Sequence, residues 1–178
     1  MSMQPPIAVK LRSRVFAMAA AFATLAGTGV AANAQDFRFD WNPRSGDPWV
    51  DSQLEDVNRY GTRYRRSFID EMVRYYGAPR NLVETLLEDE RWAPGDIYYA
   101  CAAAEVLGRP CRHVVELWER DHEQGWSVVA EQLGITPGSA RFDRIKRGFV
   151  PTYDRWGRPI QIDEDLSRHY PKRASAAK

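Results

Sequence analysis

Hydrophobic positions from residue 51 to residue 148 recur every three or four residues, the period of an α-helix with one buried face. Glycine follows several of these stretches and proline opens the next, as at Gly77 and Pro79 and again at Gly108 and Pro110. This order is typical of helix ends, because glycine adopts a left-handed conformation at the C-terminus and proline fits the first turn. The pattern predicts an all-α domain at residues 51–148, a compact bundle of five or six short helices.

The predicted helices differ in how clearly they are marked. Gly61 weakens the prediction for the first, which starts at Leu54 and Val57. Later helices are expected from Phe68 to Tyr76, from Pro79 to Leu87, from Pro94 to Leu107, from Pro110 to Gly125, from Trp126 to Leu133 and from Thr136 to Gly148. Helices this short are marginal alone, so their apolar faces must pack together.

The periodicity is absent from both flanks of this domain. Residues 35–50 contain Pro43, Gly46 and Pro48 among scattered aromatic residues, and we expect an extended arm laid on the core. The pattern ends again after Pro151, so residues 149–178 are expected to form an irregular tail. Its last eight residues are predicted to be disordered.

The N-terminus has the three parts of a secretory signal peptide. Lys10, Arg12 and Arg14 precede an uncharged apolar stretch, Val15–Ala32. Small residues follow at Ala32 and Ala34, which predicts cleavage before Gln35 and a signal peptide at residues 1–34. An uncleaved membrane anchor is the alternative, since eighteen apolar residues just span a bilayer.

Composition and charge exclude several classes of protein. The 178 residues are 44% hydrophobic and 28% charged, too charged for a protein that crosses the membrane many times and too apolar for a wholly disordered chain. The net charge of +1 excludes a polyanion binder that works by bulk charge. Removing residues 1–34, which carry three cations and no acid, leaves 144 residues with a net charge of −2 and no stable membrane span.

Two cysteines, Cys101 and Cys111, flank the predicted turn at residues 108–110. Export and an even number of cysteines favour a disulfide between them, which would join two successive helices. Such a bond requires Cα atoms within about 7 Å, so the two helices must cross at an angle. Two buried free thiols are the alternative.

Residues 126–148 have the spacing of a helix–turn–helix. The small Ala130 would allow the two helices to approach closely, and Gly134 would allow the turn between them. The second helix carries four cations that are candidates to meet phosphates: Arg141, Arg144, Lys146 and Arg147. Export argues against DNA binding, because no promoter lies outside the cytoplasm. A tight corner between two helices is the favoured interpretation, and a nucleic-acid binder with an uncleaved anchor is the alternative.

No catalytic or metal-binding pattern is present in the sequence. The three histidines, His113, His122 and His169, lack the spacing of a metal site, and Glu119 with His122 is a single Glu-x-x-His pair where di-iron bundles use two. No nucleophile elbow, zinc-protease motif or phosphate-binding glycine loop occurs. We therefore expect no enzyme activity, no metal and no cofactor.

The segment Tyr98–Ser139 contains the helical pair with its two cysteines and, from Gly125, the sequence GWSVVAEQLGITPGS. It resembles a group of small uncharacterised exported proteins of Gram-negative bacteria that share the pattern G-W-x-x-V-A-x-x-L-G-I-x-P-G-S. The resemblance covers about a quarter of the chain. It implies an all-α domain and residence in the periplasm, and it assigns no catalytic residue.

These observations lead to one functional expectation. The chain is predicted to be a periplasmic or secreted helical protein that acts by binding, as a non-enzymatic or accessory factor. Its expected partner is another periplasmic protein, and nucleic acid is not expected.

Overall fold

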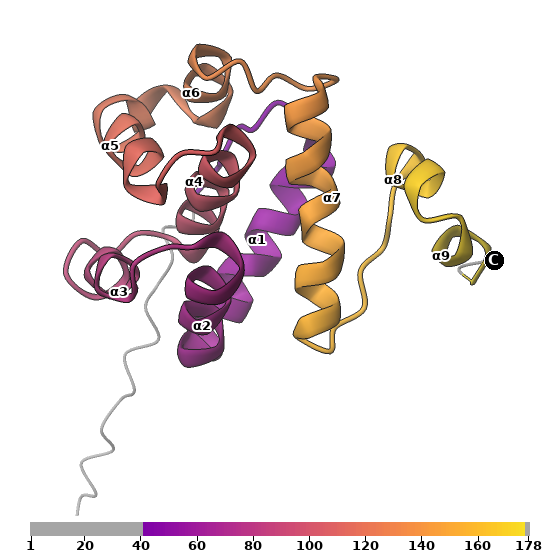
Figure 1. The fold of residues 1–178 in the computed structure, drawn as a ribbon, viewed down its shortest axis with the longest axis horizontal. Helices are drawn as coiled ribbons and strands as arrows, with labels where there is room; N and C mark the ends of the chain where they lie inside the picture. The colour runs from indigo at the N-terminus through magenta and orange to yellow at the C-terminus, as the bar shows by residue number, and fades with distance from the viewer. Residues whose placement is uncertain (1–40, 177–178) are drawn as a thin grey trace, which may run out of the picture. The chain divides into compact units, whose positions relative to one another are not determined.

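The computed structural model describes residues 41–176, and every regular element within that range is helical (Figure 1). Its elements are α1 (Pro48–Arg63), α2 (Arg65–Tyr76), α3 (Arg80–Glu88), α4 (Pro94–Leu107), α5 (Cys111–Asp121), the 3₁₀ turn η1 (His122–Gln124), α6 (Trp126–Gln132), α7 (Ala140–Arg155), α8 (Glu164–His169) and α9 (Pro171–Ala176). The predicted all-α class is confirmed. The five or six helices were predicted for residues 51–148, which α1 to α7 overlap, and α8 and α9 follow that range.

Helix α4 forms the centre of the bundle, with α1, α2, α5 and α7 packed around it (Figure 1). Almost all its side chains are buried, including the large rings of Tyr98 and Tyr99. A helix that is apolar on all sides requires such an envelope. Its ends follow the prediction, since Pro94 is the first residue and Gly108 at the C-terminus has a left-handed φ of 64°.

Helix α1 is longer than predicted and passes through Gly61. It begins at Pro48 because the Asp47 carboxylate accepts hydrogen bonds from the amides of Trp49 and Val50. This start shortens the arm predicted at residues 35–50. Gly61 is where α1 crosses α4, since a Cβ there would lie 2.5 Å from the Cβ of Pro94.

The described part of the arm, residues 41–47, is held to the body by hydrogen bonds. The Trp41 indole donates to the Asp96 carboxylate at 3.0 Å. The carbonyl oxygens of Pro43 and Arg44 accept from the amides of Trp126 and Ser127. The arm therefore supplies acceptors for the first amides of α6, which lack partners within their own helix.

The predicted irregular tail is wrong for most of residues 149–176, although residues 158–163 form no regular element. Helix α7 continues through Gly148 and Pro151 to Arg155, and α8 and α9 follow. Proline cannot donate to the carbonyl four residues earlier, and here the Tyr170 hydroxyl donates to that oxygen, on Arg147, at 3.3 Å. Buried Phe149, Val150 and Tyr153 hold the rest of the helix against the core. Residues 171–176 are helical where disorder was expected.

The predicted disulfide is confirmed. Cys101 of α4 and Cys111, the first residue of α5, are bonded with their Cα atoms 4.5 Å apart, and both are buried. The bond closes the turn that Gly108 begins and fixes the position of α5 on α4.

Candidate functional site

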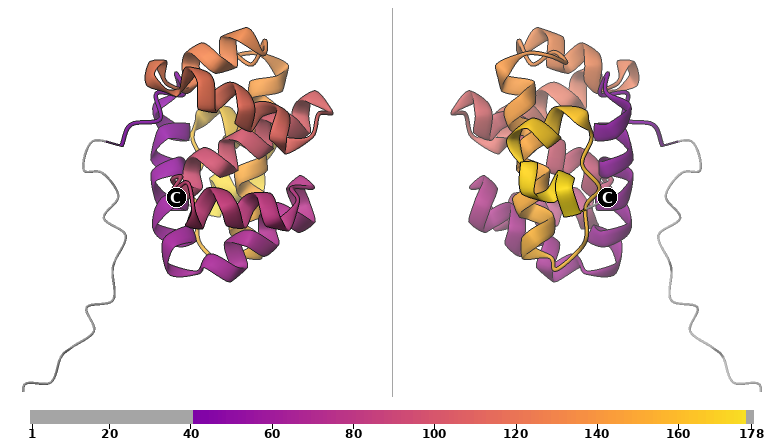
Figure 2. Two further views of the ribbon diagram at one scale, coloured as in Figure 1. Left: turned by 90° about the vertical axis from the view of Figure 1, so that its left-hand side faces the viewer. Right: turned by 90° about the vertical axis from the view of Figure 1, so that its right-hand side faces the viewer.

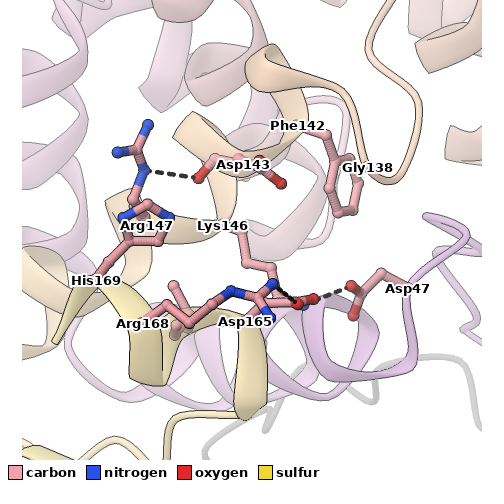
Figure 3. A pocket seen from close by; sticks show the side chains of 10 residues that line it. Asp47, Gly138, Phe142, Asp143, Lys146, Arg147, Asp165, Arg168 and His169 are labelled. Atoms are coloured by element: carbon pink, nitrogen blue, oxygen red, sulfur yellow. Dashed lines mark hydrogen bonds and ion pairs between the residues drawn. The ribbon is translucent and has the colours of Figure 1, made fainter. Parts of the chain in front are cut away.

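A cleft of about 200 Å³ lies between α7, α8 and the start of α1 (Figure 3). We call it the α7–α8 cleft. It is lined mostly by charged side chains. The lining residues are Asp47, Gly138, Phe142, Asp143, Lys146, Arg147, Asp165, Leu166, Arg168 and His169.

Local sequence explains how the two walls form. Helix α7 begins at the Ser139 hydroxyl, which accepts from the Phe142 amide, and spacings of three and four residues bring Asp143, Lys146 and Arg147 to one side. On the opposite wall, the Asp163 carboxylate caps α8 by accepting from the Leu166 amide. Figure 2 shows α8 and α9 lying over α7.

Lys146 is the centre of an ionic cluster and is almost fully buried. Its ammonium lies 2.7 Å from the Asp47 carboxylate and 2.5 Å from that of Asp163, with Asp165 at 3.5 Å. Burial by itself would lower the pKa of Lys146, but the hydrogen bonds and charges of Asp163 and Asp47 outweigh it and raise the pKa. Lys146 therefore stays charged and joins the caps of α1 and α8.

Arg147 differs from Lys146 in having no carboxylate partner. Its Nε donates to the Asp143 carbonyl oxygen at 3.2 Å, and it forms no ion pair with another described residue. It is half-buried in the cleft wall, which His169 also lines. Arg168, by contrast, is exposed and paired with Asp165. Arg147 is thus the cation of the cleft that forms no ion pair with a described residue.

The four cations predicted to meet phosphates are not one stripe. Lys146 is enclosed by three carboxylates, which corrects its prediction as a phosphate contact. Arg141 and Arg144 are exposed outside the cleft, and Arg144 lies 3.8 Å from Glu105. Of the four, Arg147 lines the cleft and forms no ion pair with a described carboxylate.

The segment at residues 126–148 forms α6, a loop and the first half of α7. Gly134 makes the turn with a left-handed φ of 65°, and the Ile135 amide donates to the Ala130 carbonyl. Helix α6 packs on α5, whereas α7 packs on α4 and buries Phe142 and Phe149 in the core. The second helix is therefore largely a core helix.

Asp96 is a second polar site, which sequence reasoning did not identify as one. Its buried carboxylate accepts one indole N–H from Trp41 at 3.0 Å and another from Trp126 at 2.8 Å. Burial raises the pKa of Asp96 to about 6, although both hydrogen bonds oppose the shift. The Trp118 ring stacks on Trp126 at 3.9 Å. The only sequence signal was an acid in the first turn of a helix.

Sequence reasoning also missed Asp165, Arg168 and His169 as cleft residues, because they lie in the segment expected to be irregular. Ala32, Ala34 and Gln35 lie outside the described residues, as do the rest of the predicted signal peptide and the start of the arm. Within residues 41–176, no helix is long and apolar enough to cross a bilayer. The same residues contain no group of three His, Cys, Asp or Glu side chains placed to hold a metal ion.

Comparison of the chain with protein-family models, with curated proteins and with solved structures finds no match.

Proposed function

We propose that this chain is exported to the periplasm and acts there as a non-enzymatic binding or accessory protein, with the α7–α8 cleft as its ligand site. The ligand chemistry that fits the cleft is a small anion such as a phosphate or a carboxylate. The observation that carries the proposal is Arg147, a half-buried guanidinium in a cleft wall with no carboxylate partner among the described residues.

Arg147 has the features of a residue that binds an anion. A guanidinium presents several N–H donors in one plane, and among residues 41–176 Arg147 uses its Nε alone. Partial burial lowers the effective dielectric around it and strengthens a charge-assisted hydrogen bond. His169 on the same cleft adds an imidazole that can donate a further hydrogen bond.

The acids that line the cleft form no ion pair with Arg147. Asp47 is engaged by Lys146, and Asp165 is shared between Lys146 and Arg168. Asp143 lies one helical turn from Arg147, which it contacts through its carbonyl oxygen. The carboxylates also restrict which anions can bind, because a ligand beside Arg147 must keep its own negative groups away from them. A small anion fits this arrangement better than an extended polyanion.

Export is supported by two independent features. The first is the order of basic, apolar and small residues at positions 10–34. The second is the disulfide between Cys101 and Cys111, a bond that persists in oxidising compartments and is rare in the cytosol.

Titration of the protein with inorganic phosphate tests the cleft directly. Weak binding is expected for the native chain, and Arg147→Gln should reduce the affinity by at least tenfold, as expected for loss of one charge-assisted bond. Arg141→Gln is the matched control, because it removes the same charge from an exposed site on the same helix. Equal effects of the two variants, or no binding by the native chain, would contradict the cleft as an anion site.

Cell fractionation tests the location separately. The proposal expects the processed protein in the periplasmic fraction. Full-length protein in the cytoplasm or inner membrane would contradict export and favour the alternative of a nucleic-acid binder with an uncleaved anchor.

A further inference from the structure

Helix α2 and the junction before it carry a surface where exposed tyrosines and exposed arginines lie together. Tyr64 and Tyr75 are the large hydrophobic side chains that stand out as exposed, at 46% and 52%. Three exposed arginines accompany them: Arg63, Arg66 and Arg74. We call these five residues the α2 Arg/Tyr surface. It lies at the end of the bundle where α1 and α7 finish, at the bottom of Figure 1.

Helical spacing places the α2 residues on neighbouring rows. Arg66, Asp70 and Arg74 are four residues apart and form one row, and Ser67, Glu71 and Tyr75 form the next. The buried side chains Phe68, Ile69 and Met72 point the other way, into the core. The exposed face of α2 thus carries Arg66, Arg74 and Tyr75, whereas Glu71 in the second row is buried and paired with Arg155.

The positive charge of this surface is only partly neutralised by acids of the described chain. Asp70 is the acid between Arg66 and Arg74, but its carboxylate is paired with Arg80. Arg63, Arg66 and Arg74 form no ion pair with another described residue. Asp70 also attracts Arg66 and Arg74, so one acid, already paired with Arg80, stands beside these exposed arginines, and positive charge remains in excess.

The tyrosines are held in a layer of rings and guanidinium groups. Arg155 lies over the Tyr75 ring at 3.8 Å, and Arg63 lies 5.4 Å from the Tyr64 centroid. Tyr60 packs beside Tyr64 at 5.1 Å. These contacts place the aromatic rings directly beside guanidinium groups. This combination suits the boundary between water and a lipid headgroup layer, where tyrosine and arginine are both favoured.

We propose that the α2 Arg/Tyr surface binds the anionic headgroups of a phospholipid bilayer, which places the protein peripherally on a membrane. The arginines supply attraction to lipid phosphates, and Tyr64 and Tyr75 enter the interfacial layer. A bilayer is the partner that a periplasmic protein meets on both sides, so the biological setting rests on the proposed export. The chemistry itself does not involve the α7–α8 cleft.

Co-sedimentation with vesicles of phosphatidylglycerol and of phosphatidylcholine tests this inference, using the protein in the form recovered from cells. Binding to phosphatidylglycerol alone is expected, with release in 1 M salt, where charge is screened within about 3 Å. Each basic residue near an anionic surface contributes about fivefold to partitioning, so replacing Arg63, Arg66 and Arg74 together by Gln should weaken binding about 100-fold.

A second triple variant keeps the change in net charge the same. It replaces Arg109, Arg112 and Arg141, which are exposed outside α2, by Gln and should bind vesicles like the native protein. Equal loss in both triple variants would overturn the proposal, because bulk charge would then account for binding. Binding to poly-L-glutamate without binding to vesicles would also overturn it and would indicate an acidic protein partner.

Two further outcomes separate this proposal from the proposed function. Vesicle binding that depends on the three arginines, in a protein retained in the cytoplasm, would support the surface and contradict export. A periplasmic protein that binds phosphate through Arg147 but ignores vesicles would support the proposed function and overturn the membrane surface.

Discussion

At the scale of single residues, Asp96 is the group whose surroundings most change its chemistry. It lies in the first turn of α4, where the helix dipole favours negative charge, and two indole N–H groups bind its oxygens. Burial is nonetheless the larger effect, and it raises the pKa to about 6. The proton on Asp96 therefore affects the stability of the folded protein near neutral pH.

The direction of this effect follows from proton linkage. An unfolded aspartate has a pKa of about 4, so between pH 4 and pH 6 the folded chain holds a proton that the unfolded chain releases. The contribution of Asp96 to the free energy of unfolding is complete below pH 4 and is lost as the pH rises through 6. A shift of about two units corresponds to about 3 kcal/mol.

The first prediction is that Asp96→Asn removes this pH dependence. Urea unfolding of the native protein should show a free energy of unfolding that falls, relative to the variant, by about 3 kcal/mol between pH 4 and pH 7. Asp89→Asn, at an exposed site at the end of α3, is the control and should keep the native slope. Parallel curves for the native protein and Asp96→Asn would contradict the account.

At the scale of helices, local signals in the sequence predicted boundaries well where the residues that make the cap are adjacent. Gly77 and Gly108 end α2 and α4 in the left-handed conformation, as their positions indicated. Prediction failed where a residue distant in the sequence determines whether a helix continues. Pro151 reads as a helix end, but Tyr170 satisfies the carbonyl that Pro151 leaves without a donor.

The candidate site was predicted only in part, for the same reason. The sequence located Lys146 and Arg147 on one helix, but the partners that distinguish them come from Asp47 and from residues 163–169. Asp96 shows the same limit, because its indole partners lie 55 and 30 residues away. Pairings between distant segments leave no local pattern in a single sequence.

The crossing of α1 and α4 gives the second prediction. Gly61→Ala should lower the free energy of unfolding by about 2 kcal/mol despite the better helix propensity of alanine, because its Cβ would meet Pro94 at 2.5 Å. Gly148→Ala is a matched control, since its Cβ would meet only the Tyr76 hydroxyl at 3.7 Å. This variant should gain about 0.5–1 kcal/mol. Thermal or urea unfolding measures both, and a stabilised Gly61→Ala would refute the close crossing.

The attachment of α8 gives the third prediction. Lys146→Met leaves three carboxylates without their cation and should cost about 2 kcal/mol, less than a fully buried pair because Asp163 and Asp165 reach solvent. Amide exchange should accelerate most in α8 and α9, which this cluster holds to α7.

Arg144→Met is the control for this experiment, because it removes an exposed cation from the same helix and should change stability by less than about 0.5 kcal/mol. Unchanged exchange in α8, or equal acceleration throughout the chain, would show that Lys146 does not hold this element.

At the scale of the whole domain, long-range bonds tie the two ends of the described chain to its centre. Trp41 joins the arm to α4 through Asp96, and Asp163 joins α8 to α7 through Lys146. The disulfide fixes α5 on the same central helix. The proposed ligand cleft and the proposed membrane surface have no residue in common, so each can be altered without the other.

The proposed export and oxidation of this chain can be tested together by the intact mass of the unreduced protein from a periplasmic extract. We expect a chain that begins at Gln35 and is two hydrogens lighter than its reduced form, which matches one disulfide between Cys101 and Cys111. A full-length chain that keeps both thiol hydrogens would contradict this expectation.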